Sequence, residues 1–284
     1  MAEFQEKIVH ANGLDFGVKQ WGSPDGTPTL GLHGWLDNAG TYDQLAPQLN
    51  ALNFCAMDMA GHGLSTHRPP GCHYYITDYI SDAIAIADRL SWPSFNLIGH
   101  SLGANVSLML AGAYPDRIKK LVLIEGFGPH TRPAGAAGSQ IRSAFAKMKN
   151  FDPNLQLIYN TWDEIVEKRM VGGTVVNRQA AESLCRRGTK DVSGGWTWRS
   201  DPRLRYASPL RFPEEEICAL IAEVTAPTCL ILGETGLPPA FMGIETRKKQ
   251  HKNLSIETLP GQHHLHLEDQ SGSVAAVINQ FLEE

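Results

Sequence analysis

Short apolar segments alternate with amphipathic segments along most of this chain. Apolar runs of about four to eight residues between turn signals are typical of buried strands, and they occur at 28–32, 53–58, 94–98, 120–125, 227–234 and 254–259. Apolar residues at helical spacing predict helices at roughly 40–51, 74–91, 104–111 and 272–283. Strands that are apolar throughout indicate a mostly parallel sheet covered by helices on both faces. We therefore expect an α/β protein.

Two stretches depart from this pattern, one at the N-terminus and one in the middle of the chain. Residues 4–21 alternate around Asn12-Gly13, a two-residue turn signal that predicts an N-terminal β-hairpin. The strand–helix alternation also breaks between 127 and 213, where helical patterns occur near 139–149, 154–169 and 177–187 without a clear buried strand. So long a segment is not a simple loop of a compact domain. We interpret 127–213 as a helical cap on a core formed by 1–126 and 214–284.

Composition limits the classes of protein to consider. The chain has 284 residues, 42% of them hydrophobic, and a net charge of −5, which indicates a soluble globular protein without a footprint for nucleic acid. Its first residues do not resemble a signal peptide, and no apolar run is long enough to span a bilayer. Five scattered cysteines without C-x-x-C spacing favour a reducing compartment. We expect a cytoplasmic monomer or homodimer without nucleic-acid or membrane partners.

Residues 99–103 read Gly-His-Ser-Leu-Gly and stand between a strand pattern and a helix pattern. A strand, a sharp glycine-flanked turn and a helix make a nucleophile elbow. Gly99 and Gly103 are required because a Cβ at either position would crowd the strand and the helix as they close on the turn. The turn exposes the Ser101 hydroxyl at the helix N-terminus, where backbone N–H groups favour a developing negative charge. Ser101 is therefore the candidate nucleophile, in preference to an incidental serine in a glycine-rich turn.

Four motifs in register resemble those of the α/β-hydrolase superfamily, and they extend over essentially the whole chain. They are a loop His-Gly-Trp-Leu-Asp at 33–37, a D-x-x-G-H-G-x-S segment at 58–65, the elbow at 99–103 and a histidine loop at 261–268. The resemblance implies an α/β-hydrolase fold with an inserted helical cap, of the serine hydrolase and esterase branch. It implies a reaction that requires no cofactor and no metal.

The resemblance places the catalytic histidine in the histidine loop. The family often runs G-H-x-x-H-x-E here, and this register selects His263, with His266 and Glu268 following it. His264 is the alternative. A metal site in the loop is the less simple interpretation, because no matching carboxylate or cysteine ligand set is visible.

The catalytic acid departs from the commonest family pattern, which places an aspartate in a G-x-x-D turn. Here the turn at 233–236 reads Gly-Glu-Thr-Gly, so Gly236 stands at the expected position. Glu234 in this turn is one candidate. Glu125, which ends an apolar strand, is preferred, because its burial needs a partner and the imidazole is the natural one. Some family members, including one branch of the haloalkane dehalogenases, carry a glutamate acid at that strand end.

The resemblance assigns the oxyanion hole to the backbone N–H of Leu102, which follows the nucleophile, and to that of Trp35 in the loop after the third strand. Gly34 shapes that loop. We expect Gly34, Trp35 and His100 to border the substrate, and the Trp35 side chain either lines the pocket or packs beneath the cap. For four polar residues of the motifs the resemblance implies mainly a role in fixing loops. They are Asp37, Asp58, His62 and His100.

Charged and aromatic residues of the expected cap leave two interpretations open. The segment 198–205 carries Arg199, Arg203 and Arg205. These arginines either recognise an acidic substrate or form ion pairs between cap and core. The aromatic residues of the expected cap either line its inner surface or stabilise its packing. They are Trp162, Trp196, Trp198 and Tyr206.

Together these features predict a serine hydrolase that cleaves small carboxylic esters through an acyl-enzyme. Ser101 attacks, His263 acts as base and then acid, and Glu125 orients it. A serine at position 101 counts against the aspartate-dependent dehalogenases and epoxide hydrolases of the superfamily. The alternatives are a carbon–carbon bond hydrolase of ring-cleavage products, in which Trp commonly follows the histidine, and a catalytically silent binding protein on the same fold.

Overall fold

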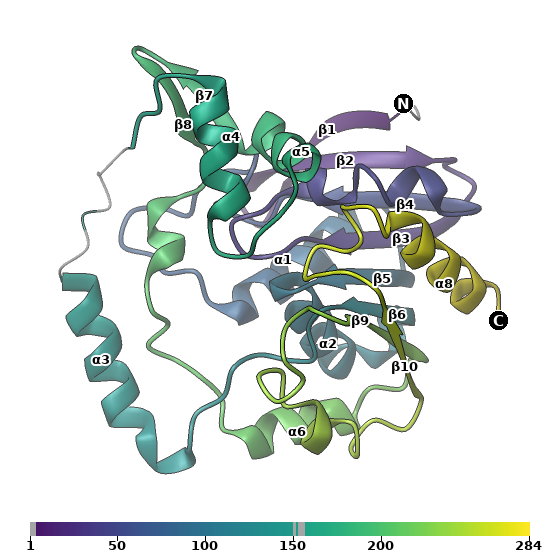
Figure 1. Ribbon diagram of the computed structural model, residues 1–284. Helices are drawn as coiled ribbons and strands as arrows, with labels where there is room; N and C mark the ends of the chain where they lie inside the picture. Colours follow the sequence, from purple (N-terminus) through teal and green to yellow (C-terminus); the bar gives the residue numbers. More distant parts are fainter. Residues whose placement is uncertain (1–3, 150–151, 153–156) are drawn as a thin grey trace.

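An eight-stranded, mostly parallel sheet organises the fold (Figure 1). The computed structural model describes residues 4–149, 152 and 157–284. The strand order is β1-β2-β4-β3-β5-β6-β9-β10, in which β2 pairs antiparallel with β1 and β4, and the remaining neighbours pair in parallel. These strands are β1 (Phe4–Ala11), β2 (Leu14–Gly22), β3 (Thr27–Leu32), β4 (Leu52–Met57), β5 (Phe95–His100), β6 (Ile118–Ile124), β9 (Thr228–Gly233) and β10 (Leu254–Leu259).

Helices cover both faces of the sheet. One face carries α1 (Ile76–Arg89), α2 (Leu102–Ala113) and α6 (Glu214–Ala222), and the other carries α8 (Ser271–Glu283). In β6, Leu121 joins the core of the first face and its neighbour Val122 joins that of the second. A strand that is buried on both sides needs apolar residues at every position, which is why these strands form continuous apolar runs in the sequence.

The sheet topology brings the sequence motifs to one edge. β3 lies between β4 and β5, so the connections that follow β3 run first toward one edge of the sheet and then toward the other. In open α/β sheets, ligands bind outside the carboxyl ends of the strands at such a reversal. Three segments lie at this edge: the loop after β3, the turn after β5 and the residue directly after β6. They contain Trp35, Ser101 and Glu125, respectively.

The predicted N-terminal hairpin is present. Leu14 pairs with Ala11, and the two turn residues Asn12 and Gly13 have φ values of 49° and 73°. Two positive φ angles in a two-residue loop match the right-handed twist of the flanking strands. The prediction from the Asn-Gly pair is therefore confirmed at the level of the turn.

The helix expected at 40–51 is wrong. Two short 3-10 turns, Ala39–Tyr42 and Ala46–Gln48, replace it. Pro47 lies in the second turn and cannot donate the backbone hydrogen bond that a continuous helix requires. Tyr42 is completely buried and its hydroxyl donates to Leu32 at 2.7 Å, so the segment is held against β3 in a non-helical path.

The segment 127–213 contains more than helices. It comprises α3 (Ala137–Lys149), α4 (Trp162–Val171), α5 (Arg178–Gly188) and a hairpin of β7 (Thr189–Val192) and β8 (Gly195–Trp198). The hairpin strands have four residues each and are not uniformly buried, so no apolar run announces them. The helix expected at 154–169 begins at Trp162, and 153–156 lie outside the described residues. Figure 1 shows α4, α5 and the hairpin together beyond one side of the sheet, with α3 standing apart. The division into core and cap domains stays a prediction.

Further features do not alter the sheet. A short helix α7 (Ile244–Arg247) lies between β9 and β10. All five cysteines are free thiols. Among the helices in the described ranges, none combines the length and apolar character that crossing a membrane requires.

A buried ion pair fastens α5 to the core. Arg187 Nε lies 2.9 Å from both carboxylate oxygens of Asp58, and the two side chains are 6% and 0% exposed. Asp58 also accepts hydrogen bonds from the backbone N–H groups of Ala39 and Leu64 at 2.7 Å. One carboxylate therefore holds two core loops and the helix of the expected cap.

We expect Arg187→Leu to lower the free energy of unfolding by about 3–5 kcal/mol, because it leaves the Asp58 carboxylate buried without its cation. Urea denaturation measures the change. Arg186→Leu is the matched control, since the Arg186 side chain is 73% exposed and its nearest carboxylate lies 3.7 Å away. We expect that substitution to change stability by less than about 1 kcal/mol. Equal losses in both variants would contradict the role given to this ion pair.

Candidate active site

Ser101 occupies the sharp turn between β5 and α2. Its φ of 53° and ψ of −112° lie in a region that residues other than glycine rarely adopt. Its backbone N–H donates to Ile124 at 2.9 Å and its carbonyl accepts from Asn105 at 3.0 Å. These bonds hold a conformation whose strain is of the order of 1–3 kcal/mol. The strained turn directs Ser101 to the pocket that it lines.

The two glycines of the elbow allow strand and helix to approach each other. A Cβ on Gly99 would lie 2.5 Å from the Gly103 carbonyl oxygen, and one on Gly103 would lie 2.1 Å from the carbonyl oxygen of Leu32. Both distances are far below a van der Waals contact and involve backbone atoms. The structure therefore agrees with the steric reason for these glycines.

The structure brings His263 and Glu125 together. His263 Nδ1 lies 3.0 Å from Glu125 Oε2, with the glutamate side chain completely buried and the histidine side chain 9% exposed. A carboxylate only accepts hydrogen bonds, so Nδ1 carries the proton and Nε2 is left as the basic nitrogen. Ser101 and His263 line the same pocket. Among the described residues no hydrogen bond joins the Ser101 hydroxyl to this ring, a contact that commonly tightens only when substrate binds.

Glu125 occupies the space where the side chain of residue 236 would begin. A Cβ built on Gly236 would lie 2.3 Å from Glu125 Oε1 and 2.4 Å from Oε2. The backbone N–H groups of Gly233 and Leu237 donate to the same carboxylate at 2.7 Å each. The turn that carries the aspartate in the commonest family pattern here surrounds a carboxylate supplied by β6.

The alternative acid and the alternative base lie differently. Glu234 is part of the turn, but its carboxylate has neither a hydrogen bond nor an ion pair to any residue that the structure describes. His264 Nε2 lies 2.9 Å from Asp37 Oδ2, and its Nδ1 lies 3.3 Å from the Thr174 hydroxyl. Both nitrogens of His264 thus face other partners. Of the two histidines, His263 is the one that contacts Glu125.

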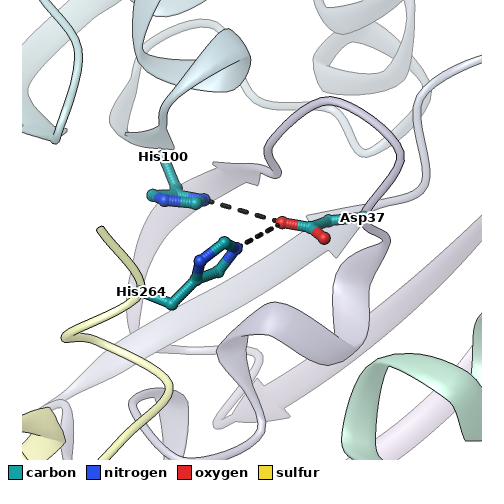
Figure 2. Close-up of side chains that lie close together, drawn as sticks. All are labelled: Asp37, His100 and His264. Carbon is teal, nitrogen blue, oxygen red and sulfur yellow. Dashed lines mark hydrogen bonds and ion pairs between the residues drawn. The ribbon is translucent and has the colours of Figure 1, made fainter. Parts of the chain in front are cut away.

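Asp37 forms a second buried cluster, in which it faces His264 and His100 (Figure 2). Its Oδ2 faces His264, and its Oδ1 accepts from Arg169 of α4 at 2.8 Å. Burial alone would raise the pKa of Asp37, but the Arg169 guanidinium and the His264 ring more than reverse this effect and hold the pKa well below its usual value. Burial lowers the pKa of His264, which favours a neutral ring. Asp37 therefore connects the loop after β3, the histidine loop and α4.

The same cluster contains the set of described residues that best resembles a metal site. Ligand atoms of Asp37, His100 and His264 lie within 4.8 Å of one another, and all three residues are buried (Figure 2). However, the Arg169 guanidinium lies 3.3 Å from His264 Nε2 and already balances the Asp37 charge. A divalent cation would be repelled by this guanidinium at close range. The donor set is that of a hydrogen-bonded ion pair.

The predicted oxyanion loop is a turn whose backbone is hydrogen-bonded to a buried, neutral histidine. Asp37 N–H donates to Gly34 at 3.1 Å, and Leu36 has a φ of 63°. His33 Nδ1 donates to the Gly34 carbonyl at 2.7 Å, while its Nε2 accepts from Met59 N–H at 2.9 Å. Complete burial lowers the pKa of His33 to about 4, so this ring stays neutral near pH 7. These contacts fix the backbone around Trp35.

A cavity of about 900 Å³ lies between these core loops and the segment 127–213. Gly34, Trp35 and His100 line this cavity, and their contact with a substrate stays a prediction. The Trp35 side chain is 48% exposed and its Nε1 donates to the Leu204 carbonyl at 3.0 Å. It therefore both lines the cavity and contacts the segment 127–213, called the cap segment below. His100 is completely buried, and its Nε2 donates to the His263 carbonyl at 3.0 Å. Its contacts are those of a support for the histidine loop.

Comparison with known proteins defines the family. Residues 30–169 match the family model described as the alpha/beta hydrolase fold. A serine hydrolase-like protein of Danio rerio is 30% identical over 274 aligned positions, which cover 93% of this chain and 83% of the fish protein. The chain belongs to the α/β-hydrolase family. The human serine hydrolase-like protein 2 is similar to this α/β hydrolase to the same degree, at 30% identity over 94% of this chain and 90% of its own.

A solved structure confirms the predicted fold class. The crystal structure of a hypothetical protein from Pseudomonas aeruginosa PAO1 matches this α/β hydrolase with a TM-score of 0.93 and 38% identity, over 98% of this chain and 99% of the other. The mostly parallel sheet flanked by helices is thus shared by both proteins. The names of the fish and human relatives support a hydrolase and state no substrate.

Sequence reasoning missed the part that the cap segment plays in the site of this hydrolase. Arg169 and Thr174 contact Asp37 and His264, and Glu268 accepts from the N–H of Asn177 at 2.6 Å. Each contact joins residues that are far apart in the chain. The one available signal was the presence of Asp37 and Glu268 in family motifs without a partner nearby in the sequence.

Proposed function

We propose that this α/β hydrolase cleaves carboxylic esters through an acyl-enzyme intermediate, with Ser101 as nucleophile, His263 as general base and acid, and Glu125 as the orienting carboxylate. The observation that carries the proposal is the buried 3.0 Å contact between His263 Nδ1 and Glu125 Oε2. A buried carboxylate is costly unless it is hydrogen-bonded. A catalytically silent binding protein on the same fold would have no need to place such a charged group behind this histidine.

In the first step, Ser101 Oγ attacks the ester carbonyl carbon and its proton passes to His263 Nε2. Glu125 keeps the ring in the tautomer with Nδ1 protonated, and it stabilises the imidazolium that forms. The carbonyl π electrons move to oxygen and give a tetrahedral intermediate with one negative charge. This step uses the basic nitrogen that the Glu125 contact leaves available.

The oxyanion is held by backbone donors. Leu102 is the first residue of α2, so its N–H has no partner within the helix and lies at the positive end of the helix dipole. Trp35 N–H in the turn after β3 is the second donor that we assign. Donors of this kind typically contribute about 10²–10³-fold to the rate each. The tightly held turn keeps the Trp35 donor in place as charge develops.

Collapse of the intermediate breaks the bond between carbonyl carbon and alkoxy oxygen. His263 gives its proton to the leaving oxygen, the alcohol departs and Ser101 is acylated. Water then attacks the acyl carbon, and His263 takes a proton from this water and returns it to Ser101 Oγ. The products are one alcohol and one carboxylic acid, and the enzyme regains its starting protonation state.

Ser101→Ala is expected to abolish hydrolysis of p-nitrophenyl esters from acetate to decanoate, because it removes the attacking oxygen. The chain length that is cleaved fastest by the wild type reports the depth of the cavity. Ser143→Ala on the exposed face of α3 serves as the control and keeps the wild-type rate. Ester turnover that persists in Ser101→Ala would refute the proposed nucleophile. Absence of turnover in the wild type on every ester would point to carbon–carbon cleavage or to a binding protein.

Glu125→Gln is expected to lower kcat by about 10²–10⁴-fold, since an amide cannot stabilise the imidazolium or maintain the tautomer as a carboxylate does. Glu234→Gln provides the matched control, because it makes the same chemical change in the neighbouring turn, and we expect less than about a twofold change. Steady-state kinetics on one ester measures both, with thermal unfolding to check the fold. The reverse ranking would move the acid to Glu234.

A further inference from the structure

The cavity beside Ser101 is strongly cationic in a protein of net charge −5. Its lining includes one carboxylate, that of Asp37, which is already paired with Arg169. Four further cations line the same cavity and have no carboxylate within ion-pair distance in the described part of the chain: Lys168, Lys190, Arg199 and Arg205. Positive charge therefore accumulates in the cavity that Ser101 and His263 line.

The arginines of 198–205 divide into two kinds. Arg203 braces the structure: it pairs with Asp201 at 2.6 Å and donates to the carbonyls of Pro69 and Cys72. Arg199 and Arg205 line the cavity instead. Asp201 raises the pKa of Arg203, whereas desolvation lowers that of Arg205, as expected of a guanidinium without a counter-charge. Arg203 thus forms its ion pair within its own segment and reaches the core through backbone carbonyls, whereas Arg199 and Arg205 have no ion pair to a described residue.

The cations and the reacting groups come from different parts of the molecule. Lys168 lies in the last turn of α4. Lys190 lies on β7, where it pairs with Thr197, and Arg199 directly follows β8. Ser101 and His263 come from the loops of the sheet. An elongated ligand can therefore place a reactive carbonyl at the core and a charged end beneath the cap segment.

Cations that converge on one cavity repel each other, and low-dielectric walls strengthen this repulsion and concentrate the field in the opening. A bound anion relieves it. Trp35 and Trp198 also line the cavity, and their aromatic rings can pack against the uncharged part of a ligand.

We infer that the cap side of this cavity is an anion-binding subsite, so that the ester substrate carries a carboxylate or phosphate group at some distance from the scissile bond. The inference rests on the proposed function, because it names the substrate class of the same site. Arg199 and Lys190 are the residues that we assign to the anion, since they are neighbours on one hairpin and free of carboxylate partners among the described residues.

The test compares two p-nitrophenyl esters of equal chain length, the monoester of glutaric acid and the ester of valeric acid. They differ in a terminal carboxylate against a methyl group. For the wild type we expect kcat/KM to be at least about tenfold higher for the glutarate ester, within the range that electrostatic focusing produces. Added salt should narrow this ratio, because both charges are accessible to ions.

The double variant Lys190→Gln/Arg199→Gln should bring the ratio close to one. The matched control is Lys119→Gln, which removes an exposed cation at the opposite, amino end of β6 and should keep the wild-type ratio. Because the readout is a ratio of two rates in one sample, a loss of folded protein cancels. A wild-type ratio near one, or an equal ratio in the double variant and in the wild type, would overturn the subsite.

Inhibition of valerate ester hydrolysis identifies the anion. Tighter competitive inhibition by n-butyl phosphate than by glutarate assigns a phosphate, and the reverse order assigns a carboxylate. If neither inhibits better than n-butanol, the inference is wrong. The two proposals fail separately: turnover that depends on Ser101 but shows no preference for the acidic ester removes the subsite alone, whereas turnover that does not depend on Ser101 removes the proposed function.

Discussion

The buried carboxylate of Glu125 is the point at which the loops around the carboxyl edge of the sheet are joined. It is completely excluded from solvent, and three donors reach it, the N–H groups of Gly233 and Leu237 and the ring of His263. A carboxylate in such a place is stable only when its oxygens are hydrogen-bonded. The end of β6, the turn after β9 and the histidine loop must therefore keep their relative positions for Glu125 to stay satisfied.

A second buried carboxylate, Asp37, extends the same constraint to the other half of the cavity. It holds the loop that carries Trp35, and through Arg169 it fixes the end of α4. Asp58 and Arg187 repeat the arrangement farther from Ser101. The cap segment is thus attached to the core by ion pairs that are largely withdrawn from water. This attachment places the surplus cations of the cap segment opposite the loops that carry Ser101 and His263.

Sequence patterns predicted most of the sheet, because β5, β6 and β9 are buried on both faces and hence apolar at nearly every position. The elbow was predictable for a different reason, because a Cβ at Gly99 or Gly103 would overlap neighbouring backbone atoms. The short, partly exposed strands β7 and β8 and the segment at 39–48, which Pro47 interrupts, carry no such pattern.

For the site, Ser101 and His263 came from a motif and a family register, and the choice of Glu125 came from its place at a strand end. That the Glu125 carboxylate fills the space next to Gly236 is a fact of three-dimensional packing between β6 and the turn after β9. No local pattern reports it. The pairing of Asp37 with Arg169 is equally invisible in the sequence, because it joins the core to the cap segment. The catalytic roles of these residues stay predictions.

The most direct test asks whether ester hydrolysis requires a carboxylate next to His263, whichever residue supplies that carboxylate. Glu125→Ala removes the carboxylate and opens the space beside position 236, and Glu125→Ala/Gly236→Asp returns a carboxylate from the other side. If the account is correct, the single variant loses about 10³-fold in ester kcat/KM, and the double variant regains at least about tenfold. A double variant that folds as stably as the single variant and is no more active would contradict the claim that a carboxylate behind His263 drives the reaction.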